Sequence, residues 1–294
     1  MSSPAHGPSS GKIRILSANT RGFSEKKADK IKSMMENNQI DLVVLQECNG
    51  KVAFEQFKGF SIMSSPEAPY CDDVVFPKDP SKNYQDEHRF KVPKDLAGGA
   101  KDYVVIARAG SSMKVEPIDF QPEKSQKVKD YLTDNKPGSG TASRGSTPPV
   151  DDSKLKALGL RPPQLMSISV PGFQSITLLN YHAPQSGGTT NGYSGMGAKL
   201  GHEIVQRVVG ELSGDKILIG DQNAHHSSLR LGYPSADIVS ATGDDLVHAV
   251  ASKGLKATEI KLGSEGKAFQ NKASEECSDH APLAVEISLT ASLA

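Results

Sequence analysis

The sequence contains no tryptophan, and only 5% of its 294 residues are aromatic. This scarcity argues against a binding mode that relies on stacking bases on aromatic side chains. No apolar run approaches the roughly 18 residues that a membrane helix needs, so we expect no membrane span. The 34 basic residues balance 34 acidic ones. A net charge of zero argues against a generally polycationic nucleic-acid coat, although a local basic groove is compatible with it.

Cysteine is also scarce. The three cysteines are an odd number and form no CxxC pair, which argues against both a disulfide scaffold and a structural zinc site. A reducing compartment is the simpler expectation. The first eleven residues are polar and lack the charged and apolar regions of a secretory signal, so we expect a disordered tail over 1–11 and a cytoplasmic location.

The remaining chain, 12–290, is predicted to form a single domain and a monomer. Two segments near 62–97 and 116–160 are rich in proline, charge or small polar residues, and we interpret them as flexible insertions. Apolar patterning predicts helices at 25–38, 197–212 and 243–253, and strands at 12–19, 41–47, 101–108, 165–170, 175–183, 216–223 and 282–289. Helices alternate with hairpin-like strand pairs, which favours a layered α/β domain over a Rossmann-type sheet.

Polar residues gather where these apolar strands stop. The set comprises Asn19, Glu47, His182, Asp221, Asn223, Asp279 and His280. Carboxylates without clustered cysteine or histidine suit a hard cation such as Mg²⁺ or Mn²⁺, which can neutralise phosphoryl oxygens. Each residue taken singly also fits an ordinary turn, cap or structural histidine. His225 and His226 invite a metal reading, but adjacent side chains rarely point the same way.

Five segments in this order carry a resemblance: SANT, LQE, YHAP, IGDQN and SDHAP. They resemble the signatures of the endonuclease/exonuclease/phosphatase superfamily, whose fold is deoxyribonuclease I-like. GDQNAHHSSL is similar to retroelement-type endonucleases, and RPPQLMSISV to the nuclease subunit of cytolethal distending toxin; both relatives stay open. The resemblance implies a four-layered α/β sandwich with two central mixed sheets and the active site at one edge.

The resemblance also implies roles for the residues that hold metal and water. Glu47 would ligate the divalent metal, with Asn19 beside it and Asp279 as a further ligand. Asp221 would orient and activate the attacking water, helped by Asn223.

Other residues would contact the substrate. His280 would bind the scissile phosphate, His182 would lie close to the leaving oxygen, and Arg161 would contact a substrate phosphate. Relatives place an aspartate, often followed by an aromatic residue, as the partner of the final histidine. Here a strand alignment puts Val247 at that position, Asp245 could substitute, and a helix over 243–253 would remove the partner altogether.

These observations together predict a divalent-metal-dependent phosphodiester hydrolase that acts on nucleic acid, in the first place as an endonuclease on DNA. Two alternatives stay open. One is a phosphatase or phosphodiesterase with a small or lipid phosphate substrate, because fold alone does not decide substrate. The other is a catalytically weakened binding module of the same fold, which the missing aspartate would explain.

Overall fold

The computed structural model describes residues 11–66, 74–75, 89–90, 102–108, 112–118, 125–128, 163–171, 175–184, 192–194, 196–271 and 277–290. The predicted tail therefore lies outside the described residues, apart from Gly11. Within the described residues, no helix has the length and apolarity needed to span a bilayer.

The first of two six-stranded sheets is built around one parallel pair, β1 and β2, in register from Ile15 opposite Leu42 to Asn19 opposite Gln46. All other neighbours in this sheet are antiparallel. The strand order is β13 (Leu255–Ile260), β14 (Leu283–Leu289), β1 (Lys12–Asn19), β2 (Leu42–Cys48), β6 (Asp102–Ala107) and β3 (Ser61–Pro66).

The second sheet repeats this plan around the parallel pair β9 and β10, while its other neighbours are antiparallel. Its order is β11 (Asp237–Ala241), β12 (Asp244–Ala251), β10 (Asp215–Asp221), β9 (Ile176–Asn180), β8 (Gln164–Ser169) and β7 (Lys114–Pro117). A separate antiparallel pair joins β4 (Val74–Val75) to β5 (Arg89–Phe90).

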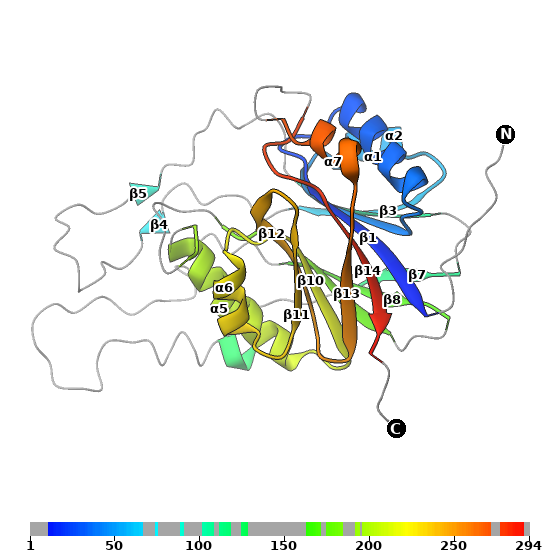
Figure 1. Ribbon diagram of the computed structural model, residues 1–294. Helices are drawn as coiled ribbons and strands as arrows, with labels where there is room; N and C mark the ends of the chain where they lie inside the picture. The colour runs from blue at the N-terminus through cyan, green and yellow to red at the C-terminus, as the bar shows by residue number, and fades with distance from the viewer. Residues whose placement is uncertain are drawn as a thin grey trace, which may run out of the picture.

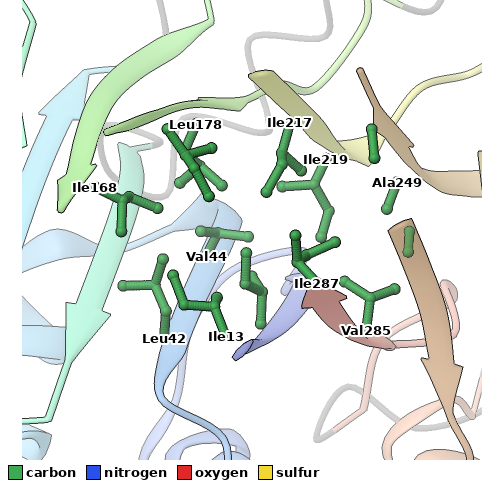
Figure 2. Packing of buried hydrophobic residues seen from close by; sticks show 14 of the residues in the cluster. Ile13, Leu42, Val44, Ile168, Leu178, Ile217, Ile219, Ala249, Val285 and Ile287 are labelled. Atoms are coloured by element: carbon green, nitrogen blue, oxygen red, sulfur yellow. The ribbon is translucent and has the colours of Figure 1, made fainter. Parts of the chain in front are cut away.

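The two sheets face each other across a dry apolar core. Figure 2 shows aliphatic side chains from both sheets meeting in this space: Ile13, Leu42, Val44, Val285 and Ile287 from the first, and Ile168, Leu178, Ile217, Ile219 and Ala249 from the second. Most of them are β-branched or small, which suits close packing between pleated surfaces. All of these side chains are buried, so this interface carries much of the hydrophobic stabilisation.

Helices cover the outer face of each sheet (Figure 1). On the first sheet lie α1 (Glu25–Asn37), α2 (Gly50–Gln56) and α7 (Gly263–Phe269). Ser24 begins α1, because its side chain accepts a hydrogen bond from the Lys27 amide. On the second sheet lie α5 (Met196–Glu211) and α6 (His226–Gly232). The order helix, sheet, sheet, helix confirms the predicted four-layered α/β sandwich.

One predicted element is wrong. Residues 243–253 contain no helix, because Asp244–Ala251 form β12, whose Val247, Ala249 and Ala251 face the inter-sheet core. Val250 packs under the helices on the opposite face. A strand buried on both sides reads as a continuous apolar run, which periodicity alone does not separate from a buried helix.

The two segments interpreted as insertions are described only in part. Residues 62–66 belong to β3, which pairs with β6 at the edge of the first sheet. In the second segment, β7 pairs with β8, and Val128 packs against Ile204 and Val208 of α5. Most of the other residues of both segments lie outside the described part of the chain.

Ile219 of β10 is fully buried between the sheets, and its truncation tests how much the dry core contributes. We expect Ile219→Ala to lower the free energy of unfolding by about 2–5 kcal/mol, since it leaves a cavity that the packed sheets close only in part. Equilibrium urea unfolding measures this. Leu231→Ala, at a side chain that is 85% exposed, is the control and should shift the midpoint little; equal losses in both variants would contradict the assignment of the core.

Candidate active site

The two parallel strand pairs end at the same edge of the sandwich, and this arrangement brings the predicted polar residues together. Asn19 is the last residue of β1, and Glu47 lies next to the end of β2. In the other sheet, His182 follows β9 by two residues and Asp221 is the last residue of β10. Because parallel strands place their carboxyl ends together, four separate segments deliver polar groups to one place.

A buried polar layer separates this edge from the apolar core. The Gln46 amide donates to Asn180 Oδ1 across the sheets at 2.6 Å, and it also lies 3.2 Å from Ser17 Oγ. The Asn180 amide donates in turn to the Leu45 carbonyl at 3.1 Å. Close by, the backbone N–H of His182 donates to the Tyr103 hydroxyl at 3.1 Å. The bonds from Gln46 to Asn180, from Asn180 to Leu45 and from His182 to Tyr103 join the two sheets. They fix the position of the strand ends of one sheet relative to those of the other.

Asp221 is at the centre of the cluster and is 1% exposed. Its Oδ2 accepts a hydrogen bond from Asn19 Nδ2 at 3.0 Å and lies 3.3 Å from His280 Nε2 and 3.6 Å from His182 Nε2. Its Oδ1 accepts from the backbone N–H of Asn223 at 3.1 Å. The structure therefore brings together residues from both sheets around one buried carboxylate.

His280 has a second carboxylate partner on its other ring nitrogen. Its Nδ1 lies 3.0 Å from Asp244 Oδ2, and the same oxygen accepts from the backbone N–H of Ala281 at 3.1 Å. Burial by itself lowers the pKa of His280, but the hydrogen bond to Asp244 and the charges of Asp221, Asp244 and Asp279 outweigh it and raise the pKa to about 9. His280 is therefore an imidazolium at neutral pH.

The pairing with His280 also changes the pKa of Asp244. Burial raises the pKa of its carboxyl, but the hydrogen bond and charge of His280, together with backbone N–H donors, lower it overall. Asp244 is thus the partner of the final histidine. The two alternatives considered from sequence do not hold, since Asp245 contacts His225 and Val247 is buried between the sheets. Sequence reasoning missed Asp244 because it placed the strand too late and favoured a helix.

Glu47, the candidate metal ligand, lies opposite His182 in the cluster. His182 Nδ1 lies 3.7 Å from Glu47 Oε1, and both side chains are largely buried. The Asn19 Oδ1 accepts from the backbone N–H of Arg21 at 3.1 Å, which directs this oxygen toward the turn after β1. Asn223 Nδ2 donates to the Ala183 carbonyl at 2.8 Å, which fixes its side chain beside Asp221.

Three non-glycine residues at this edge have a left-handed backbone: Arg21 (φ 44°), Glu47 (φ 50°) and Asn223 (φ 46°). This conformation is costly for Arg and Glu and milder for Asn. The buried Lys27 ammonium supports the turn by donating to the carbonyls of Thr20 at 2.7 Å and Gly22 at 2.9 Å. The surrounding hydrogen bonds therefore hold the side chains in place against the backbone preference.

The remaining predicted residues lie at the rim or out of view. Asp279 is about a third exposed, pairs with Arg21 at 3.3 Å and lies 4.0 Å from His280 Nε2. Ser278 donates to the Asn19 carbonyl at 2.6 Å and accepts from the His280 N–H at 3.1 Å, which is a supporting role for the loop. Arg161 lies outside the described residues.

His225 and His226, which are adjacent in the sequence, do not form a metal centre with each other. His225 Nδ1 lies 2.6 Å from Asp245 Oδ2, whereas His226 Nδ1 lies 3.2 Å from Ser240 Oγ. Across the described ranges, no group of three or more His, Cys, Asp or Glu side chains has the geometry of a metal cage. A cation bound beside Asp221 would need oxygen donors such as Glu47 and Asn19, together with water and substrate.

Comparisons with known proteins agree with this architecture. No family model and no curated protein sequence matches the chain. The structure is similar to the endonuclease domain of TRAS1, a telomere-specific non-LTR retrotransposon, with a TM-score of 0.50 and 13% identity over 95% of this chain and 99% of that one. It is also similar to a D. rerio TDP2 humanized by 14 mutations, with a TM-score of 0.51 and 12% identity over 94% of this chain and 98% of that one.

These likenesses establish the fold. The chain has the deoxyribonuclease I-like fold of the endonuclease/exonuclease/phosphatase superfamily, as its five motifs predict.

The pairing of His280 with Asp244 predicts a pH-dependent contribution to stability. The folded pKa of His280, about 9, lies above the reference of 6.5, so its stabilising effect is fully present below about pH 6.5 and is lost as the pH rises through 9. We expect NMR titration of the His280 ring to give a pKa near 9, and Asp244→Asn to lower it. An unchanged His280 pKa in this variant would contradict the pairing.

Proposed function

We propose that this protein is a divalent-metal-dependent phosphodiester hydrolase that cleaves DNA as an endonuclease. The observation that carries the proposal is the position of a charged imidazole, His280, 3.3 Å from the buried Asp221 carboxylate and held from behind by Asp244. A fixed positive charge beside a fixed general-base candidate is what attack of water on a phosphodiester requires.

His280 supplies the charge-stabilising part. With Nδ1–H directed to Asp244, its Nε2–H is the group that a non-bridging phosphate oxygen would approach. Negative charge develops on these oxygens in the transition state, and a donor fixed beforehand stabilises it without reorganisation. The raised pKa keeps the donor protonated at neutral pH.

Asp221 and Asn223 supply the water-activating part. The attacking water would lie between the two side chains and pass a proton to Asp221 as its oxygen bonds to phosphorus. The bond from phosphorus to the leaving oxygen then breaks. The resemblance implies that His182, whose Nε2 lies 3.6 Å from Asp221 Oδ2, would donate a hydrogen bond to that leaving oxygen.

The donor set near Glu47 fits a magnesium-type cation. Mg²⁺ prefers one or two carboxylates and keeps several waters or substrate oxygens, so Glu47 with the Asn19 amide oxygen meets its need. Asp279 at the rim could join once Arg21 releases it. Such a cation supplies charge neutralisation at the phosphoryl and leaving oxygens. Glu47 holds its position through the turn at φ 50° and through His182.

DNA is the proposed substrate because the GDQNAHH segment resembles that of retroelement-type endonucleases, and the fold is similar to the endonuclease domain of a non-LTR retrotransposon. The alternative of a catalytically weakened binding module rested on a missing aspartate. Asp244 fills that role in the structure, so the argument for this alternative is lost. A small or lipid phosphate substrate is the outcome to test beside DNA.

Glu47→Gln tests the metal assignment, since it keeps the size of the side chain and removes the charge that holds a hard cation. We expect plasmid nicking in Mg²⁺ to fall by a factor on the order of 10², with chelator abolishing it in the parent protein. Glu286→Gln, whose partners Lys12 and Arg14 lie on another part of the first sheet, is the matched control and should cleave at the parent rate. Parent activity of Glu47→Gln in limiting Mg²⁺ would rule the assignment out.

A double-variant cycle tests whether Asp244 and His280 act as one unit. We expect Asp244→Ala and His280→Ala each to lower kcat by about 10² or more, and the double variant to be little worse than either one, because coupled residues are not additive. Asp29→Ala, an exposed site on α1, serves as the control. Additive losses in the cycle would mean that Asp244 acts independently of His280.

A further inference from the structure

The residues next to the proposed catalytic groups form a second histidine–aspartate pair that the chemistry above does not use. His225 follows Asn223 by two residues, and Asp245 directly follows Asp244. His225 Nδ1 lies 2.6 Å from Asp245 Oδ2, and both side chains are about half exposed, at 44% and 62%. An exposed pair of this kind adds little stability.

The backbone beneath this pair is nevertheless held rigidly. Buried His248 places its Nε2 2.8 Å from the Ala224 carbonyl and 2.8 Å from the Asp245 carbonyl, so one imidazole anchors the segments of both partners. Nε2 must be the protonated nitrogen for this, and Nδ1 then faces Ser240 Oγ at 2.9 Å. Burial lowers the pKa of His248, which keeps it in this neutral form.

The chain before α6 is fixed from the other side as well. The His225 N–H donates to the Gly192 carbonyl at 2.8 Å, and the Ser194 N–H donates to the Asn223 carbonyl at 2.7 Å. Gly192 has φ +77°, and a Cβ there would clash with Ser228 Oγ, so this segment passes close to α6. His225 is thus a preorganised side chain at the surface, beside a buried cluster, which is typical of a group that meets a ligand.

The position of the His225–Asp245 pair in the chain relative to the contacts of Asp221 indicates which kind of ligand the pair would bind. Asn19, His182 and His280 surround Oδ2 of Asp221, whereas Asn223 contacts Oδ1. His225 follows Asn223, the residue that contacts Oδ1, by two residues. Its Nδ1 is directed to Asp245, and in the part of the chain that the structure describes no hydrogen bond joins Nε2 to another group. In its imidazolium form, Nε2–H is a charge-assisted donor suited to a phosphate oxygen.

We propose that His225, oriented by Asp245, binds a backbone phosphate next to the scissile one on a DNA strand. His225 is the contacting residue and Asp245 is its positioning residue. This inference rests on the proposed function, because it extends the same site along a polynucleotide. A small phosphodiester, which has no neighbouring phosphate, would not reach His225.

The test compares His225→Ala, Asp245→Ala and the double variant with the parent in two assays. The first is the affinity for a fluorescein-labelled DNA oligonucleotide, measured by anisotropy in chelator so that the strand stays intact. The second is Mg²⁺-dependent turnover of bis(p-nitrophenyl) phosphate. We expect His225→Ala to weaken DNA binding roughly ten-fold, as for one charge-assisted hydrogen bond, and to leave turnover of the small substrate unchanged. His226→Ala, the neighbouring histidine, should bind DNA within about two-fold of the parent.

Asp245→Ala separates positioning from simple electrostatics. Loss of a negative charge by itself strengthens DNA binding, whereas loss of the group that orients His225 weakens it. We expect weaker binding, with the double variant close to His225→Ala. Tighter binding in Asp245→Ala, parent-like binding in His225→Ala, or no DNA binding by the parent would each overturn the inference. An absence of Mg²⁺-dependent plasmid nicking by the parent, with His225-dependent DNA binding intact, would instead overturn the proposed function alone.

Discussion

The relative position of the two sheets at the site is set by buried hydrogen bonds between them, and the shortest of those described is the 2.6 Å contact between Gln46 of β2 and Asn180 of β9. The apolar core beneath it is non-directional, since aliphatic side chains tolerate small shifts along the strands. A buried amide pair tolerates them less well, because a shift would break a directional hydrogen bond in a medium of low dielectric constant. This contact therefore turns two packed sheets into a single edge with fixed geometry. Every distance around Asp221 depends on it, because Asn19 and Glu47 come from one sheet and His182 from the other.

The cluster also shows how charge is arranged in a confined space. Asp221 alone in this position would carry an uncompensated buried charge, and His280 between two carboxylates offsets it. Asp244 lies on β12, the neighbour of β10, while His280 precedes β14 in the other sheet. The ion pair is thus a further link between the sheets. Cohesion of the sandwich and the protonation state of the histidine have the same physical cause.

Much of the fold and the site could be predicted from the sequence, because the strands that carry the site are short apolar runs ending in polar residues. The strands at 12–19 and 282–289 agree with β1 and β14 to within one residue. The segment around Asp244 could not be predicted in this way. A helix or a strand over this segment would be buried on two faces, so the apolar pattern does not distinguish them. The strand begins directly after Gly243, whose φ is +88°. The partner of His280 follows from that starting point, which depends on the hairpin with β11 and on the longer-range pairing with β10. The His225–Asp245 pair was hidden for the same reason.

The left-handed backbone at Arg21 and Glu47 has a consequence for how this protein can change. Glycine or asparagine would relax the chain at both positions, so selection for thermal robustness alone would favour replacing the two side chains. Engineering that ranks substitutions by folding energy would accordingly propose large gains at Arg21 and Glu47, and these two positions should be held fixed in any stabilised version of the protein.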